Sequence, residues 1–173
     1  MNTEQLISEF LRQYPYLRKL IKRIYQFAMY TFSPKIKSQG NILCVSPDGE
    51  GECFFGYYDK SPWDADDRYM LCIRVKDAYS NAAPSDMAEI LLIDTQNNNN
   101  YRLLAKTATW NVQQGCMLQW LGPDYKESII YNDFRDGQYC SVILNIRTGN
   151  ETIVNRPVYS VSQDGSFGLS LDF

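Results

Sequence analysis

The 173-residue chain is long enough to bury a hydrophobic core, and its 45% hydrophobic and 21% charged residues are those of an ordinary globular protein. It contains no histidine, which removes the usual general base and the commonest metal ligand, so Ser-His-Asp, Cys-His and His-metal chemistry are excluded within this chain. We expect no metal site and no cofactor. Residues 1–37 carry seven Lys and Arg against two Glu, or +5, whereas the remainder carries ten basic against eighteen acidic residues, or −8.

The basic segment, residues 1–37, is predicted to be helical and amphipathic. Apolar residues recur there at three- and four-residue spacings from Leu6 to Ala28. Pro15 lacks an amide donor and disfavours helical geometry at Tyr14, so we expect a kink there or two helices that meet there. The apolar face either docks on a membrane surface or on a protein partner, or packs on the rest of the chain. The acidic body argues against nucleic acid as a partner.

The five cysteines and the N-terminal residues favour the cytoplasm. No C-x-x-C pair occurs, and most cysteines lie in apolar runs such as "MLCIRV", where Cys behaves as a small hydrophobe, so we expect reduced core thiols. The first residues, "MNTEQLISEF", lack the basic n-region of a cleavable signal peptide, and no apolar run approaches the ~20 residues of a membrane span. The expected location is cytoplasmic, or membrane-peripheral if the helical segment binds lipid.

From residue 41 onward the pattern is all-β. Short runs rich in Val, Ile, Tyr, Phe and Cys alternate with Gly, Asp, Asn and Pro turns, and no helix-length apolar period interrupts them. The predicted strands are 41–46, 53–58, 69–75, 88–94, 101–107, 116–121, 128–134, 138–146, 151–155, 159–162 and 167–173.

These strands recur in similar groups. "YDKSPWDADDRYMLCIRV", followed after an insertion by "AEILLIDTQNNNNYRLLAK", returns as "MLQWLGPDYKESIIYNDFRDGQYCSVILNIRTGNETIV", and a third copy begins as "YSVSQDGSFGLSLDF". Four strands at a spacing of about 40 to 60 residues are the signature of a β-propeller blade. We predict a mainly β fold, an incomplete β-propeller of about two and a half four-stranded blades over residues 41–173. Because propellers typically close with about 4 to 8 blades, we expect the chain to be the N-terminal part of a longer protein.

Aromatic and charged residues at the first strand-to-loop junction predict a saccharide site. Flat rings stack on the C–H faces of pyranoses, while Asp and Lys hydrogen-bond hydroxyls or acidic substituents. The candidate residues are Tyr57, Tyr58, Asp59, Lys60 and Trp63. In the alternative interpretation the rings pack between blades, and Asp59 and Lys60 form an ion pair within a turn.

A second candidate group precedes the innermost strand of the second copy, where propeller loops converge on the central channel. It comprises Trp110, Asn111, Gln113 and Gln114. Amides this close together are costly to bury unless they are paired, which suggests a polar channel mouth. Alternatively, the two glutamines satisfy backbone groups of neighbouring blades.

The segments "GYYDKSPWD", "TATWNVQQGCMLQWLGPD", "IIYND" and "RPVYSVSQDGSFGLSLDF" resemble a family of bacterial propeller proteins encoded near surface-polysaccharide genes. Members are loosely labelled as glycosyltransferases and are distantly similar to oligogalacturonate lyase and TolB-type propellers. The resemblance covers about residues 41–173 and implies a protein that binds or processes a saccharide in cell-surface polysaccharide assembly. Oligogalacturonate lyases use histidines around a metal, so the lack of histidine argues against lyase chemistry. The alternative function is a protein-interaction scaffold without an active site.

Overall fold

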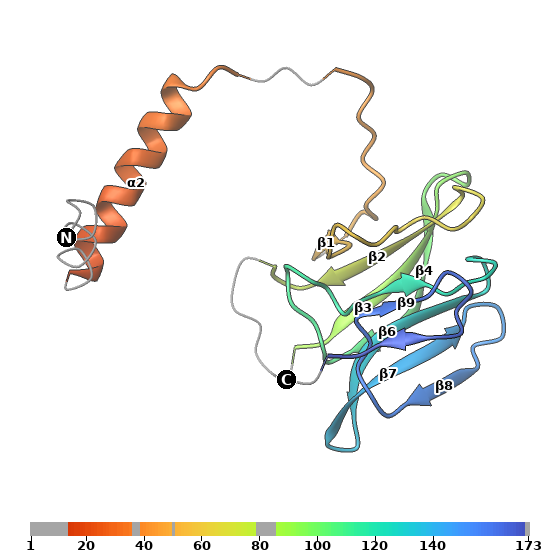
Figure 1. Cartoon of the computed structure of the whole chain (residues 1–173). Coiled ribbons are helices and arrows are strands. Elements are labelled where there is room, and N and C mark those ends of the chain that lie inside the picture. The colour runs from red at the N-terminus through yellow and green to blue at the C-terminus, as the bar shows by residue number, and fades with distance from the viewer. Residues whose placement is uncertain (1–13, 36–38, 50, 79–85, 172–173) are drawn as a thin grey trace. The chain divides into compact units, whose positions relative to one another are not determined.

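The computed structural model describes residues 14–35, 39–49, 51–78 and 86–171 (Figure 1). The chain divides into two compact units, Met1–Ile42 and Leu43–Phe173. The described part is mainly β, with several antiparallel sheets and one helix. The predicted helical pattern before residue 14 lies outside the described residues.

The first unit contains helix α2, Pro15–Phe32. The helix begins at Pro15, where a missing amide costs little because first-turn amides have no acceptor within the helix. Tyr14 has φ −124° and ψ 77°, outside the helical region, so only the later side of the expected kink or junction is described. The helix ends at Ser33, which is extended and donates its amide to the Met29 carbonyl at 2.8 Å. No helix in the described part of the chain is long and apolar enough to cross a membrane.

The second unit contains two four-stranded antiparallel sheets, each in sequential strand order, and a two-stranded hairpin (Figure 1). The first sheet is formed by β1 (Glu52–Phe54), β2 (Tyr69–Val75), β3 (Ala88–Asp94) and β4 (Asn100–Thr107). The second sheet is formed by β5 (Gln119–Trp120), β6 (Ser128–Arg135), β7 (Gln138–Asn145) and β8 (Glu151–Val154). The hairpin is formed by β9 (Ser160–Val161) and β10 (Gly168–Leu169).

Most predicted strands are present, but one is not. Strands 69–75 and 88–94 have the predicted bounds, and four others differ by one residue at an end. The first strand of each group and the last predicted strand, 167–173, are shorter than predicted. The prediction of a strand at 41–46 is wrong: the segment is irregular, with Ile42 76% and Leu43 73% exposed. No described strand pairs with it, and an apolar run forms a strand only where a second backbone completes the ladder. In the second sheet, Met117 has a φ of 54°, which breaks the predicted strand 116–121 ahead of Gln119.

One hairpin geometry occurs three times in this unit. Each hairpin has a facing residue pair, followed by a backbone hydrogen bond that closes the turn. The facing pairs are Trp63 with Met70, Trp120 with Ile129, and Val161 with Gly168. The closing amide and carbonyl belong to Asp64 and Tyr69, Leu121 and Ser128, and Ser162 and Phe167, at 2.8 to 2.9 Å. The same local pairing therefore leads into β2, into β6 and into β10.

The main core lies between the two sheets, which are side by side in Figure 1. Alternate residues of β2 and β3, among them Ile73 and Ile90, pack with Ile129, Tyr131 and Val142 of the second sheet, and all five are fully buried. Each such aliphatic side chain contributes about 1.5–3 kcal/mol when it leaves water. A smaller cluster lies on the other face of the second sheet, and its buried members are Met117, Ile130 and Val158. Through this cluster the segment before β9 packs on the second sheet.

Candidate functional site

Three loops that precede the repeated hairpins meet at one place. They are residues 55–62, residues 108–118 and residues 155–159. A Cβ atom on Gly56 would lie 2.9 Å from the Gln114 carbonyl oxygen, and one on Gly115 would lie 2.9 Å from that of Phe55. The first two loops therefore touch through their backbones, at glycines whose φ values of +120° and +61° most residues avoid. The first and third loops meet where Lys60 Nζ lies 5.0 Å from the centroid of the Tyr159 ring.

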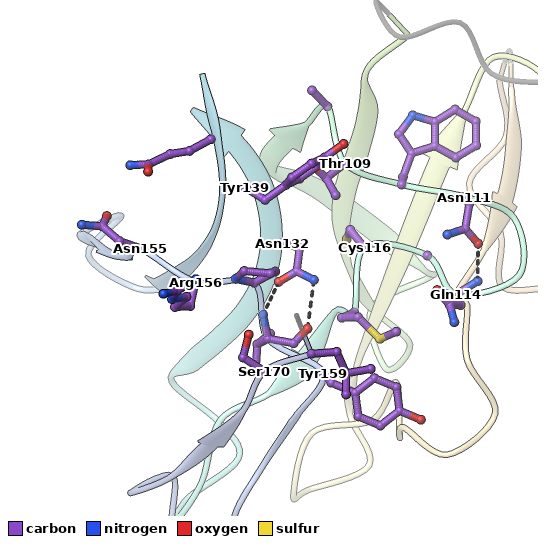
Figure 2. A pocket seen from close by; sticks show the side chains of 18 residues that line it. Thr109, Asn111, Gln114, Cys116, Asn132, Tyr139, Asn155, Arg156, Tyr159 and Ser170 are labelled. Carbon is purple, nitrogen blue, oxygen red and sulfur yellow. Dashed lines mark hydrogen bonds between the residues drawn. The ribbon is translucent and has the colours of Figure 1, made fainter. Parts of the chain in front are cut away.

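A pocket of about 880 Å³ opens beside this junction, on the face of the second sheet that the segment before β9 partly covers (Figure 2). Its volume is within the about 300–1,000 Å³ of typical ligand pockets. Its walls come from the loop after β4, the middle of β6, the start of β7, the segment before β9 and the residues after β10. The polar and aromatic lining residues are Thr109, Trp110, Asn111, Gln114, Asn132, Gln138, Tyr139, Asn155, Arg156, Tyr159 and Ser170.

Asn132 of β6 holds one wall of the pocket in place. Its side-chain amide donates to the Val158 carbonyl at 2.9 Å, and its side-chain oxygen accepts from the Val158 amide at 2.7 Å (Figure 2). This pair imitates a β-ladder between β6 and the third loop. Asn132 is only 8% exposed and Val158 6%, so both hydrogen bonds are shielded from water.

Asp133, the next residue, holds the opposite wall. One carboxylate oxygen accepts from the Thr107 hydroxyl and from the Ala108 amide, both at 3.1 Å, where the second loop leaves β4. The other lies 2.8 Å from Nε of Arg135. Burial alone would raise the pKa of Asp133, but these hydrogen bonds outweigh burial and hold the pKa below its usual value. Adjacent residues of one strand thus fix two loops of the site.

The described lining combines aromatic rings, amides, hydroxyls and one cation. Rings of Trp110, Tyr139 and Tyr159 lie among amides and hydroxyls, and Arg156 is the one charged residue among the described lining residues. No carboxylate is present in that lining. The Cys116 thiol is buried, which raises its pKa to about 12 and keeps it protonated at neutral pH, so it is no nucleophile. Among the described residues no group of three or more His, Cys, Asp or Glu is arranged to hold a metal ion.

The first candidate group, residues 57–63, lies beside the pocket rather than in it. The Tyr57 and Tyr58 rings stack with centroids 4.7 Å apart, and the pKa of Tyr57 is raised by its contact with Tyr58 and further by Tyr159. Lys60 Nζ lies 2.7 Å from a carboxylate oxygen of Asp59, so these two side chains form the ion pair of the alternative interpretation. Trp63 is 36% exposed and pairs with Met70. Lys60 of this group contacts the ring of Tyr159, which is a residue of the pocket wall.

The second candidate group largely lines the pocket. Trp110, Asn111 and Gln114 belong to its wall, whereas Gln113 is exposed and outside it. The Asn111 side-chain oxygen accepts a hydrogen bond from the backbone amide of Gln114 at 2.7 Å, which closes the turn between these two residues (Figure 2). The amides of this group are exposed or half-buried, so the expected cost of burying them does not arise.

Sequence reasoning missed the residues that other segments supply. Tyr139, Asn155, Arg156 and Tyr159 come from the start of β7 and the segment before β9. Nothing in the local sequence marks them, because they meet the second loop only after the strands have paired. Asn132 had a visible signal: it is an amide in the predicted strand "SIIYNDF", where an unpaired polar group would be costly to bury.

Comparison of the chain with protein-family models, with curated proteins and with solved structures finds no match. The resemblance to surface-polysaccharide propellers therefore stays a prediction. The function is argued from the geometry and chemistry of the pocket.

Proposed function

We propose that the second unit consists of β-propeller blades and that its pocket binds a saccharide. The architecture is supported by two sheets in sequential strand order, the second of which follows the last strand of the first along the chain. The thrice-repeated hairpin and the packing of one sheet face on the next support it as well. Loops that enter successive blades gather around the channel of a propeller, and here they meet beside the pocket.

The observation that carries the saccharide proposal is the pairing of aromatic rings with amides in one pocket. Rings of Trp110, Tyr139 and Tyr159 offer flat apolar faces to the C–H side of a sugar. Asn111, Gln114, Gln138 and Asn155 add donors and acceptors that match vicinal hydroxyls.

The same lining argues for binding over hydrolysis. Glycoside hydrolysis usually requires two carboxyl groups across the scissile bond, and the described lining has none. Arg156 supplies a positive charge that accepts a neutral or an acidic sugar and disfavours a basic one. The resemblance to surface-polysaccharide propellers makes oligosaccharides of bacterial surface polymers the first ligands to test.

A glycan array of bacterial surface-polysaccharide fragments tests the proposal, with Trp110→Ala beside Trp110→Phe. The alanine variant removes the stacking face, and we expect at least a roughly tenfold loss of affinity, equivalent to about 1.4 kcal/mol. The phenylalanine variant keeps a face and loses only the indole donor to the Asp86 carbonyl, so it stays near the wild-type affinity. Trp63→Ala, outside the pocket, is the matched control and should bind normally.

Thermal melts of all four proteins separate loss of binding from loss of fold. A chain that binds no glycan, or whose Trp110→Ala variant binds as the wild type does, would contradict the proposal. Such a result would leave the protein-interaction scaffold as the better account of this unit.

A further inference from the structure

Helix α2 has two chemically different halves. At ~100° per residue most of its apolar side chains occupy one half of the circumference and its basic ones the other. The apolar half includes Leu17, Leu20, Ile21, Ile24, Phe27, Ala28 and Phe32. Among the described residues most of these side chains are exposed: Ile24 is 60% exposed and Phe27 73%. The helix thus presents a long apolar stripe to its surroundings.

The other half is basic. Four basic residues occur in the helix sequence and no acidic one, and the side chains of Lys19, Lys22 and Arg23 are exposed. The Leu43–Phe173 unit carries the opposite charge, with ten basic and eighteen acidic residues. An anionic surface therefore attracts the helix and repels the rest of the protein.

Aromatic residues complete the pattern. Tyr16 and Tyr25 lie at the two borders between the apolar and basic halves, and both are exposed. Tyrosine favours the interface between headgroups and acyl chains, where its ring is in apolar surroundings and its hydroxyl reaches water. Four charged residues within one helix are incompatible with a path across the hydrocarbon, whereas they suit a helix that lies in the plane of the interface.

We propose that α2 binds the surface of membranes rich in anionic lipids, with its apolar half among the acyl chains and its basic half at the headgroups. The ligand is the lipid surface itself: anionic headgroups attract the basic residues and the acyl region accepts the stripe. This attachment is independent of the saccharide site, because it uses the first unit alone.

Sedimentation of the full chain with vesicles of phosphatidylcholine and phosphatidylglycerol, beside vesicles of phosphatidylcholine alone, tests this proposal. We expect strong binding to the mixed vesicles, weak binding to the neutral ones, and weakening as salt rises. Replacing Lys19, Lys22 and Arg23 by Gln should weaken binding about a hundredfold, since each basic residue near an anionic leaflet strengthens it roughly fivefold.

Two matched controls keep the test specific. A second triple variant replaces Lys106, Lys126 and Arg147, which are exposed in the second unit, by Gln. It changes the net charge of the protein as much as the first triple variant does, and it should retain most of the binding. Ile24→Glu should abolish binding, whereas Gln26→Glu, which adds the same charge to the basic half, should weaken it only severalfold. Equal losses in the two triple variants, or an intact chain that ignores anionic vesicles because the stripe packs on protein, would overturn the proposal.

Discussion

Replacing Asn132 by leucine is expected to lower the free energy of unfolding by about 2–5 kcal/mol and to abolish ligand binding in the pocket. Leucine has a similar size but leaves the Val158 amide and carbonyl without their partners. Either these groups stay buried and unsatisfied, or the third loop leaves β6 and opens the pocket wall. The first outcome lowers the stability, and the second also removes the pocket wall. Urea unfolding followed by tryptophan fluorescence, together with a glycan-binding assay, measures the two effects.

The control for this variant is Asn150→Ala, which changes an exposed asparagine in the turn between β7 and β8. We expect its stability to stay within about 0.5 kcal/mol of the wild type, with full binding. If Asn132→Leu unfolds at the wild-type urea concentration and still binds glycan, Asn132 does not hold the wall.

Asp133→Asn is the second variant with a large expected effect, a loss of about 2–4 kcal/mol at pH 7. The residue is 5% exposed, and its carboxylate accepts hydrogen bonds from Thr107, Ala108 and Arg135 together. The asparagine side chain has the same shape, and its oxygen still accepts hydrogen bonds from the loop. Its NH2 group, however, is a donor and then faces the Arg135 guanidinium, which is also a donor. Arg135 retains Glu151 at 2.7 Å, so the loss is smaller than that for an isolated buried charge.

The effect of Asp133→Asn depends on pH with a defined sign. The folded-state pKa of Asp133 is lowered, so its contribution is complete above the unfolded-state pKa of about 3.9 and is lost as the pH falls through the folded-state value. The stabilities of the wild type and the variant should therefore begin to converge as the pH falls below about 4. Asp136→Asn makes the same chemical change at an exposed turn residue with a φ of 50°, which asparagine tolerates, and should be nearly neutral. A stability difference at pH 3 as large as at pH 7 would contradict this role for Asp133.

Strands were predictable where local pattern and pairing agree. The runs 69–75 and 88–94 hold mostly buried apolar residues between turn residues, and they pair with each other. The run 41–46 has similar composition but no partner strand among the described residues, and composition cannot reveal a partner. The left-handed φ of Met117 was equally invisible, because methionine rarely adopts it and nothing in "GCMLQW" signals it.

The candidate site was predictable only as far as one loop reaches. Trp110, Asn111 and Gln114 are close in sequence and line the pocket together. Tyr139 and Tyr159, which complete it, are brought there by two separate strand pairings. A rule based on clusters in sequence therefore found one wall of the pocket and missed the opposite one.

The most direct test of the saccharide site uses the indole signals of the three tryptophans in a ¹H–¹⁵N NMR titration with the best oligosaccharide from the glycan array. Trp110 lines the pocket, Trp120 is 3% exposed with its indole bonded to the Pro62 carbonyl, and Trp63 lies outside. We expect the Trp110 signal to shift and saturate with ligand while the Trp120 and Trp63 signals stay in place. A saturating ligand that leaves Trp110 unmoved, or that shifts Trp63 alone, would contradict a saccharide site in this pocket.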